Sequence, residues 1–310
     1  MTTIDTIDNL GGTVLNQLSD DLASAVERAG AWTVTVNARR RMPATGIVWS
    51  DNGLIVTANH VVEQNEDITI GLPDGRTVPA KLLGRDPGSD IALLKIEVSG
   101  LTVPPRGDNP VRAGNLALAI GRPGPSGPMA SFGVVSVVGG SWRTQRGDSV
   151  EGYVRADVAM LPGFSGGPLV DPTGNLIGLN SSTLGRGGGL TVPAAAIDGV
   201  VAALQTHGKV RRGFLGIGAQ AVAIPRGLAS AAGVSQETGL VVVNVDAGSP
   251  ADKDGIFLGD VIVAVNETPV ASVEELMDHL VGDLVGQPVR ILVIRGGQRQ
   301  DVTVTVGERA

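Results

Sequence analysis

The sequence predicts a mainly β protein with two domains, and three observations carry this prediction. Its 310 residues exceed what one hydrophobic core usually serves, so two domains are expected. Hydrophobic residues make up 42% of the chain but aromatic ones only 3%, so the cores must be built from Val, Ile, Leu and Ala. The 45 glycines and the many β-branched residues favour short strands joined by tight turns.

The N-terminal segment, residues 1–30, has the pattern of a helix rather than of strands. Leu15, Leu18, Leu22 and Val26 recur at helical spacing, with polar residues between them. We expect one amphipathic helix over 15–29 that packs on the domain following it.

From Trp32 the pattern changes to short strands separated by polar turns. Asp51-Asn52-Gly53 and Pro73-Asp74-Gly75 are strong hairpin signals. The six strands expected here form one small barrel and cover Trp32–Asn37, Gly46–Trp49, Leu54–Ala58, Asp67–Leu72, Thr77–Arg85 and Ile91–Ile96. A second barrel is expected over 116–192, with polar or glycine-rich loops at 120–128, 141–150 and 185–189, and a closing helix over Ala194–Leu204.

Three side chains of these barrels could form a nucleophilic site. Ser165 lies in Gly163-Phe164-Ser165-Gly166-Gly167, where glycine lets the backbone turn so that a hydroxyl is exposed beside converging N–H groups. A serine hydroxyl needs a base, normally a histidine held by a carboxylate. His60 follows an apolar strand, and Asp90 precedes another. The order His60, Asp90, Ser165 is that of the chymotrypsin-like double β-barrel.

The pattern Gly163-x-Ser165-x-Gly167 also fits the nucleophile elbow of α/β-hydrolases, which would make the protein an esterase. An elbow serine opens a helix, and its acid and histidine follow it in the chain. Here Pro168 comes shortly after Ser165, and residues 168–179 read as strand, turn and strand. This pattern leaves no room for the helix, so the barrel interpretation is favoured.

Composition excludes several classes of function. A formal net charge of −7 argues against a nucleic-acid partner, which would need a basic face. The chain has no cysteine, so disulfides and thiolate metal sites are excluded. It has no nucleotide-binding motif and no metal-ligand cluster, so we predict chemistry that needs no cofactor, ATP or metal.

The sequence also suggests a compartment. No stretch reaches the roughly 20 apolar residues of a membrane span, so no integral membrane segment is expected. The first eight residues lack the basic start and the apolar run of a signal peptide. We therefore expect a soluble, cytoplasmic protein as the sequence is written, with export left open if the N-terminus is incomplete.

The chain resembles the HtrA-type serine proteases, the trypsin-like proteases of protein quality control that carry PDZ domains. The likeness runs from about Ala31 to the C-terminus, and four stretches carry it: Thr57–Val62, Asp86–Leu94, Asp157–Val170 and Arg212–Ile217. The resemblance implies an ATP-independent serine endopeptidase that cleaves unfolded or misfolded proteins through an acyl-enzyme. It also implies three segments, namely an N-terminal helical segment at 1–30, a protease domain at 31–207 and a PDZ domain at 208–310.

The resemblance implies roles for single residues as well. Ser165 would be the nucleophile, His60 the base and Asp90 its orienting acid, with the N–H groups of Gly163 and Ser165 as the oxyanion hole. The substrate would bind along an edge strand with small or medium aliphatic P1 residues preferred, and the residues implied are Ser182, Thr183, Leu190 and Val192.

The C-terminal part resembles a PDZ domain in its permuted form. PDZ domains add a peptide as an extra strand and hold its terminal carboxylate on backbone N–H groups. The carboxylate loop would be Phe214, Leu215, Gly216 and Ile217, and the helix 272–284 would supply Val273, Leu276, Met277 and Leu280. The expected partners are therefore unfolded or peptide substrates and peptide C-termini, and a homotrimer is a further family expectation.

One residue departs from the family pattern. Phe164 precedes the nucleophile where most HtrA relatives have Asn. An aromatic ring here could pack under the loop and fix the oxyanion geometry, or displace it and leave the site dormant. The second outcome would make the protein an inactive PDZ scaffold or chaperone that keeps the protease fold.

Overall fold

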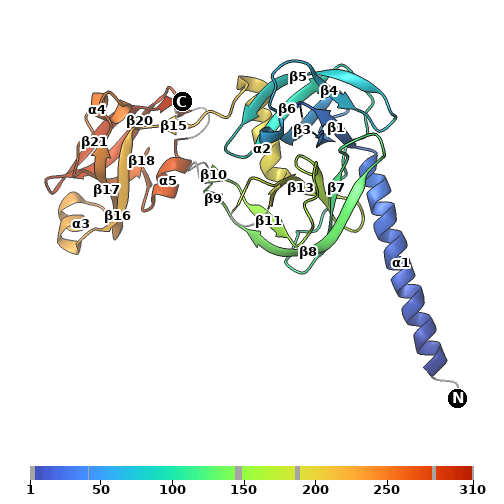
Figure 1. Cartoon of the computed structure of the whole chain (residues 1–310). Coiled ribbons are helices and arrows are strands. Elements are labelled where there is room, and N and C mark those ends of the chain that lie inside the picture. The colour runs from blue at the N-terminus through green and yellow to red at the C-terminus, as the bar shows by residue number, and fades with distance from the viewer. Residues whose placement is uncertain (1–3, 41, 144–148, 186–188, 281–283, 309–310) are drawn as a thin grey trace. The chain divides into compact units, whose positions relative to one another are not determined.

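The computed structural model describes the chain except for residues 1–3, 41, 144–148, 186–188, 281–283 and 309–310. It divides into two compact units, Met1–Lys209 and Val210–Ala310. The first contains two closed barrels and the second an open sheet (Figure 1). The mainly β prediction is therefore confirmed, and the double barrel is of the chymotrypsin-like type.

The first barrel closes in the order β1-β2-β3-β6-β5-β4. Its strands are β1 (Thr33–Asn37), β2 (Ala44–Val48), β3 (Leu54–Ala58), β4 (Ile68–Gly71), β5 (Thr77–Asp86) and β6 (Ile91–Ile96). The hairpin turns predicted around Gly53 and Gly75 are present, and both glycines have positive φ angles, of 96° and 89°. A short 3-10 helix, η1 (Asn59–Val61), follows β3 at the rim of the barrel.

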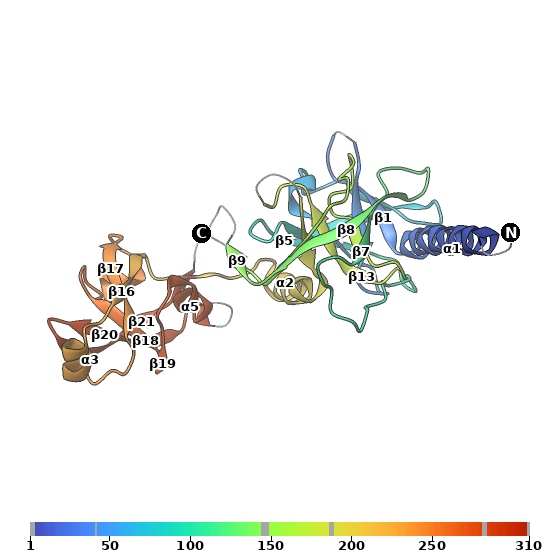
Figure 2. The same cartoon turned by 90° about the horizontal axis from the view of Figure 1, so that it is seen from below.

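The second barrel closes in the order β11-β14-β13-β12-β7-β8, with β8 as its long outer strand (Figure 2). Its strands are β7 (Leu116–Gly121), β8 (Met129–Gly139), β11 (Tyr153–Ala156), β12 (Pro168–Val170), β13 (Leu176–Ser181) and β14 (Leu190–Pro193). β9 (Trp142–Arg143) and β10 (Ser149–Val150) form a separate antiparallel pair. Pro168 begins a strand and not a helix, so the nucleophile-elbow alternative does not hold. The loop predicted over 120–128 begins two residues later, because β7 runs to Gly121, and residues 122–128 connect β7 and β8. Parts of the other two predicted loops, 144–148 and 186–188, lie outside the described residues.

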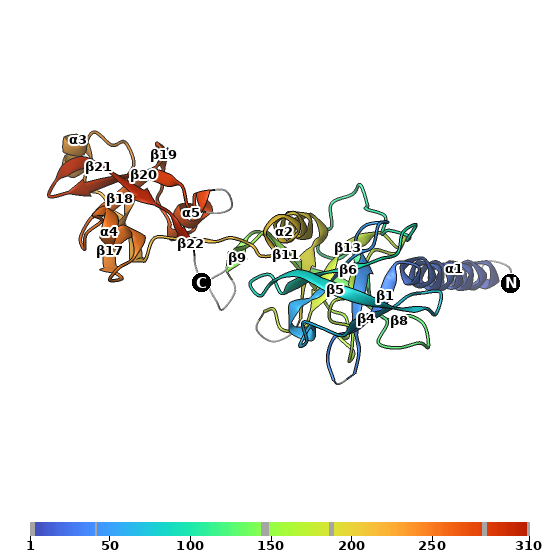
Figure 3. The same ribbon diagram turned by 90° about the horizontal axis from the view of Figure 1, so that it is seen from above.

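The N-terminal helix is longer than predicted and packs differently. α1 covers Ile4–Gly30 and runs out from the barrels (Figure 3). Ala25 and Ala29 near its end are fully buried, but Val14 and Leu15 are 66% and 68% exposed. The expectation that the helix packs along 15–29 is thus wrong for its first half. Helical spacing of apolar residues predicts a helix, but it does not say whether a surface faces the apolar stripe.

The closing helix joins the two barrels. α2 (Ala194–His207) contacts β5 and β6 of the first barrel and β13 and β14 of the second. Ile197 and Leu204 on its inner face are buried. Gly208 ends the helix in the left-handed conformation, φ 69°, and donates its N–H to the Leu204 carbonyl at 2.9 Å.

The second unit is a sheet in the order β16-β17-β18-β20-β21, with β19 paired to β18. Its strands are β15 (Gly213–Phe214), β16 (Ile217–Ala223), β17 (Thr238–Val245), β18 (Val261–Val265), β19 (Thr268–Pro269), β20 (Pro288–Arg295), β21 (Gln298–Thr305) and β22 (Gly307–Glu308). Its helices are α3 (Arg226–Ala232), α4 (Pro250–Asp254) and α5 (Val273–Asp278).

The core of this unit is made of aliphatic side chains, as the composition requires. Leu240, Ile262 and Ile291 are fully buried in it. The predicted helix 272–284 ends early, because α5 stops at Asp278 and His279 caps it; residues 281–283 lie outside the described part.

Candidate active site

The imidazole of His60 and the carboxylate of Asp90 form a close pair at the rim of the first barrel. His60 lies in η1 directly after β3, and Asp90 directly precedes β6, the strand paired to β3. Asp90 Oδ2 is 2.7 Å from His60 Nδ1, and Asp90 Oδ1 accepts the His60 backbone N–H at 2.9 Å. The carboxylate is almost fully buried, while the His60 side chain is 24% exposed. Because Nδ1 faces the carboxylate, Nε2 is the ring nitrogen left as a possible base.

Two features hold Asp90 in place. Asp86 is buried at the start of the turn and accepts hydrogen bonds from the N–H groups of Gly88 and Ser89 and from the Ser89 hydroxyl. Asp90 itself has a positive φ of 55°, a conformation that Asp tolerates better than most residues. Its Oδ2 also accepts the hydroxyls of Ser181, at 2.5 Å, and Thr183, at 3.0 Å. With so many donors on it, this carboxylate has a fixed orientation.

Ser165 follows a tight turn of the second barrel. Pro162 and Gly163 occupy the central positions, Gly163 has φ 87°, and the Phe164 N–H donates to the Leu161 carbonyl at 3.0 Å. These are the features of a type II turn, which requires a positive φ at its third residue. Among the hydrogen bonds of the described residues, no acceptor is assigned to the N–H groups of Gly163 and Ser165. Both N–H groups are therefore available to an oxyanion.

Thr45 of the first barrel fixes the backbone on both sides of Ser165. Its hydroxyl donates to the Gly163 carbonyl at 2.6 Å, and its backbone N–H donates to the Ser165 carbonyl at 3.3 Å. Thr45 is fully buried and also accepts the Arg122 N–H at 2.8 Å. The sequence analysis missed this residue. Only its position on a strand of the first barrel could have suggested it, because a Thr in a strand is ordinary.

The two glycines after Ser165 are required by close packing. A Cβ on Gly166 would lie 2.2 Å from the Thr45 carbonyl oxygen and from Thr57 Oγ1, and Gly166 has φ 84°. A Cβ on Gly167 would lie 2.2 Å from the Ile120 carbonyl oxygen. A larger residue at 166 would clash with strands of the first barrel, and one at 167 with β7 of the second. These glycines thus set the distance between the nucleophile and the strands beside it.

Phe164 packs under the turn. Its side chain is fully buried in the core of the second barrel, against residues that include Ala117, Ala119 and Leu169. The ring fills the space over Gly121, where a Cβ would lie 2.3 Å from Phe164 Cδ1. Of the two arrangements weighed for this aromatic, the structure has the one in which the ring packs under the loop.

Ser165 and His60 are brought together without a direct bond between their side chains. Among the described residues, the hydroxyl of Ser165 is hydrogen-bonded to the hydroxyl of Ser182 at 2.9 Å, and that of Ser182 to His60 Nε2 at 3.4 Å. A cavity of about 340 Å³ opens here and is lined by His60, Ser165 and Ser182 together with Met160. Of the three residues predicted from chain order, His60 and Ser165 therefore share one cavity, and Asp90 is buried behind His60.

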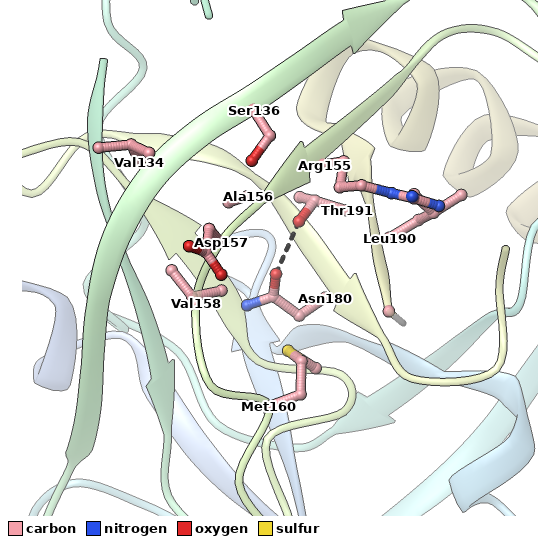
Figure 4. Close-up of a pocket in the computed structure, with 11 residues that line it drawn as sticks. Val134, Ser136, Arg155, Ala156, Asp157, Val158, Met160, Asn180, Leu190 and Thr191 are labelled. Atoms are coloured by element: carbon pink, nitrogen blue, oxygen red, sulfur yellow. Dashed lines mark hydrogen bonds between the residues drawn. The ribbon is translucent and has the colours of Figure 1, made fainter. Parts of the chain in front are cut away.

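A second pocket of about 450 Å³ lies beside the first and shares Met160 with it. Figure 4 shows Asn180 and Thr191 facing each other in this pocket, joined by a hydrogen bond of 2.7 Å. Leu190 lines this pocket, and Val192 does not. Val192 is 2% exposed and belongs to the interior. Apolar character indicates burial, but it does not say which surface a side chain faces.

A buried cation lies near the turn Leu161–Phe164, which we call the oxyanion turn because it contains one proposed oxyanion donor, Gly163, and precedes the other, Ser165. Arg122 is 9% exposed, and burial lowers the pKa of its guanidinium below the ordinary value. Its Nη2 donates to the Gly30 carbonyl at 2.8 Å, at the C-terminal end of α1, where the helix dipole favours a positive charge. Arg122 therefore ties α1 to the loop that precedes β8.

The predicted peptide-binding residues of the second unit line one pocket. This pocket has a volume of about 280 Å³ and lies between the start of β16 and α5. Its lining includes Phe214, Leu215, Gly216, Ile217, Val273, Leu276, Met277 and Leu280. Gly216 has φ 78°, and no acceptor within the described chain is assigned to the N–H groups of Leu215 and Gly216. These N–H groups could donate hydrogen bonds to a carboxylate, although Leu276 and Leu280 of the pocket are also core residues.

Two family models match the chain, and they divide it in the same order as the two units. A trypsin-like peptidase domain matches residues 44–179, and a PDZ domain matches 213–306. The solved structure of the HtrA-type protease AlgW with a decapeptide is 30% identical, with a TM-score of 0.76 over 93% of this chain and 99% of that one. The chain belongs to the HtrA-type serine protease family. A serine endoprotease from Yersinia pestis gives this HtrA-type chain a similar match, with 31% identity and a TM-score of 0.76 over 93% of this chain and 98% of that one.

Curated relatives agree with this assignment. A probable periplasmic serine endoprotease, DegP-like, from Pseudomonas putida is 36% identical over 270 residues, which cover 85% of this HtrA-type chain and 55% of the relative. A protein of the same description from Halomonas elongata is 35% identical over 276 residues, covering 87% and 57%. The chain thus spans a little more than half the length of these relatives.

The expected compartment needs correction. The sequence analysis expected a cytoplasmic protein, and this expectation is wrong, because the relatives of this HtrA-type chain are named periplasmic. It was based on the composition of the first eight residues, which does not by itself fix a compartment. In the described part of the chain, none of the helices has both the length and the apolar character needed to cross a membrane.

Proposed function

We propose that the protein is a serine endopeptidase that works through an acyl-enzyme. The observation that carries the proposal is the short His60 to Asp90 contact, 2.7 Å between Nδ1 and Oδ2, in the same cavity as the Ser165 hydroxyl. A buried carboxylate on Nδ1 keeps the proton on that nitrogen and leaves Nε2 as the base. Membership of the HtrA-type family supports the same chemistry.

In the proposed reaction, Ser165 Oγ attacks the carbonyl carbon of a peptide bond while His60 Nε2 takes its proton. The negative charge on the carbonyl oxygen is stabilised by the N–H groups of Gly163 and Ser165, and Asp90 stabilises the imidazolium. His60 then returns the proton to the leaving amine. Water then attacks the carbonyl carbon of the ester while His60 takes its proton. The proton passes to Ser165 Oγ as the carboxylic acid product leaves.

Substrates of the proposed enzyme are unfolded or misfolded proteins, because only an extended chain can pair along the segment after β13. Ser182 and Thr183 belong to this segment, and both are exposed. We propose the pocket shared by Met160, Leu190 and Thr191 for the P1 side chain. Its lining mixes apolar residues with polar and charged ones, among them Arg155 and Asp157, and an aliphatic P1 residue is proposed from the family resemblance.

The second unit is proposed as a PDZ domain that binds extended peptides or peptide C-termini. The pocket between β16 and α5, with its N–H groups in the Leu215-Gly216 turn, supports this role. The names of the relatives support action in the periplasm. The segment boundaries 1–30, 31–207 and 208–310 and the homotrimer remain predictions from the family resemblance.

Hydrolysis of unfolded casein, without ATP or added metal, tests the proposal. The wild type should release peptides, and Ser165→Ala should release none. A matched control is Ser235→Ala, which changes an exposed serine of the second unit and should leave the rate unchanged. If folded wild type and Ser165→Ala protein are equally inactive, the endopeptidase proposal fails and the inactive scaffold takes its place.

A further inference from the structure

Three hydroxyl-bearing residues follow one another where β13 ends, and the middle one has a different partner. Ser181 and Thr183 both donate to Asp90 Oδ2. The Ser182 hydroxyl lies 2.9 Å from Ser165 Oγ and 3.4 Å from His60 Nε2. The backbone N–H of Ser182 also points to Ser165 Oγ, at 3.4 Å. Ser182 therefore presents both a hydroxyl and an N–H to the nucleophile.

The position of the Ser182 hydroxyl matters because His60 has a single acceptor site. A neutral imidazole whose Nδ1–H donates to a carboxylate has a single acceptor lone pair, on Nε2. The reaction requires Ser165 to donate its proton there. Among the described residues, the hydrogen-bond partner of Nε2 is the Ser182 hydroxyl. One lone pair does not accept two hydroxyls in line, so Ser182 competes with Ser165 for the base.

We propose that Ser182 is a positioning residue, which holds the Ser165 hydroxyl away from His60 while no substrate is bound. This inference rests on the proposed endopeptidase function. The Ser165 to Ser182 bond joins two neutral hydroxyls at a partly exposed place, so breaking it costs little. Substrate entering the cavity brings its carbonyl over Ser165, and the hydroxyl then turns to His60. Ser182 thereby lowers the fraction of reactive nucleophile in the resting enzyme.

The test measures the reactivity of Ser165 without a natural substrate. A fluorophosphonate reacts with an activated serine: a bond forms between Ser165 Oγ and phosphorus, the phosphorus–fluorine bond breaks, fluoride leaves, and His60 takes the serine proton. Removal of one net hydrogen bond corresponds to roughly a 2- to 12-fold change. Ser182→Ala should therefore be labelled roughly 2 to 12 times faster than wild type, in the full chain.

Two further variants separate positioning from a structural effect. Ser182→Thr keeps the hydroxyl and should restore the wild-type labelling rate, whereas Ser182→Gly also lacks it and should match Ser182→Ala. Ser235→Ala is the distant control and should label like wild type. With a chromogenic peptide, Ser182→Ala should lower KM and leave kcat unchanged, because the Ser165 to Ser182 bond is broken when the peptide binds. Thermal unfolding of each variant confirms that the compared proteins are folded.

The outcomes distinguish this inference from the proposed function. If wild type is labelled and Ser165→Ala is not, the endopeptidase site exists. Slower labelling of Ser182→Ala and Ser182→Gly would mean that Ser182 relays the proton. A rate equal to that of wild type would mean that Ser182 has no influence. Either result overturns this inference and leaves the proposed function standing. Absence of labelling in all folded variants overturns the proposed function and this inference with it.

Discussion

Replacement of Phe164 by Ala tests whether the buried ring holds the oxyanion turn. The ring is fully buried, and truncation of a buried Phe costs about 3–5 kcal/mol, from lost apolar transfer and the cavity left behind. The residue also stands between Gly163 and Ser165, the two proposed oxyanion donors. Loss of one donor costs about 3 kcal/mol in the transition state, or about a hundredfold in kcat. We therefore expect both stability and kcat to fall.

The two effects are measured separately. Urea unfolding gives the free energy of unfolding, and hydrolysis of a chromogenic peptide well below the melting temperature gives kcat for the folded protein. Phe132→Ala is the matched control, because that ring lies on β8 and is 50% exposed. It should cost less than about 1 kcal/mol, as is usual for surface positions, and leave kcat unchanged. Phe164→Ala could lose the expected stability while its kcat stays within about twofold of wild type, a loss far smaller than that for one oxyanion donor. That result would refute the reasoning, because the ring would then support the core without positioning the turn.

Three more predictions follow from the contacts of the site and of the second unit. Thr45→Val removes the hydroxyl that the Gly163 carbonyl accepts; it should destabilise the protein by about 1–3 kcal/mol and lower kcat, while Thr45→Ser restores both in the same unfolding and peptide assays. Asp90→Asn keeps the side-chain shape but no longer fixes the proton on Nδ1, so kcat should fall by a factor of about 10⁴, and a loss below tenfold contradicts the assigned role. Arg295→Gln leaves Asp260, 2% exposed, without its guanidinium, and urea unfolding should show a loss of about 3 kcal/mol in the second unit; an unchanged midpoint would mean that the pair contributes nothing.

The sequence was sufficient to single out the residues of the candidate site because their chemistry is visible locally. His60 and Asp90 stand next to strongly apolar strands, and Ser165 stands among glycines. Their order in the chain then selects the double barrel. The contacts that position them are long-range, and this is why Thr45 was missed: it is 118 residues from Gly163 and lies on an ordinary strand.

Elements with weak patterns were predicted less well. β16 (Ile217–Ala223) is half-exposed and rich in small residues, so it lacks the alternation that marks a strand. The helix α1 was expected from spacing alone, and its exposed half shows that spacing reports periodicity and not a packing partner. For the same reason Val192 was expected near a substrate pocket, whereas the pocket proposed for the P1 side chain is lined by Thr191. A side chain's partner depends on tertiary structure that a single strand does not encode.

The positions of the site residues depend on one another through a continuous set of hydrogen bonds. The Gly30 carbonyl at the end of α1 accepts Arg122 Nη2, and the Arg122 N–H donates to the Thr45 hydroxyl. That hydroxyl donates to the Gly163 carbonyl in the turn of the nucleophile. Every group in this path is buried or partly buried, so a break at any point leaves an unpaired polar group, which costs more than the bond itself contributes. The last turn of α1 is therefore part of the structure that holds the oxyanion turn, although it lies far from Ser165 in the chain.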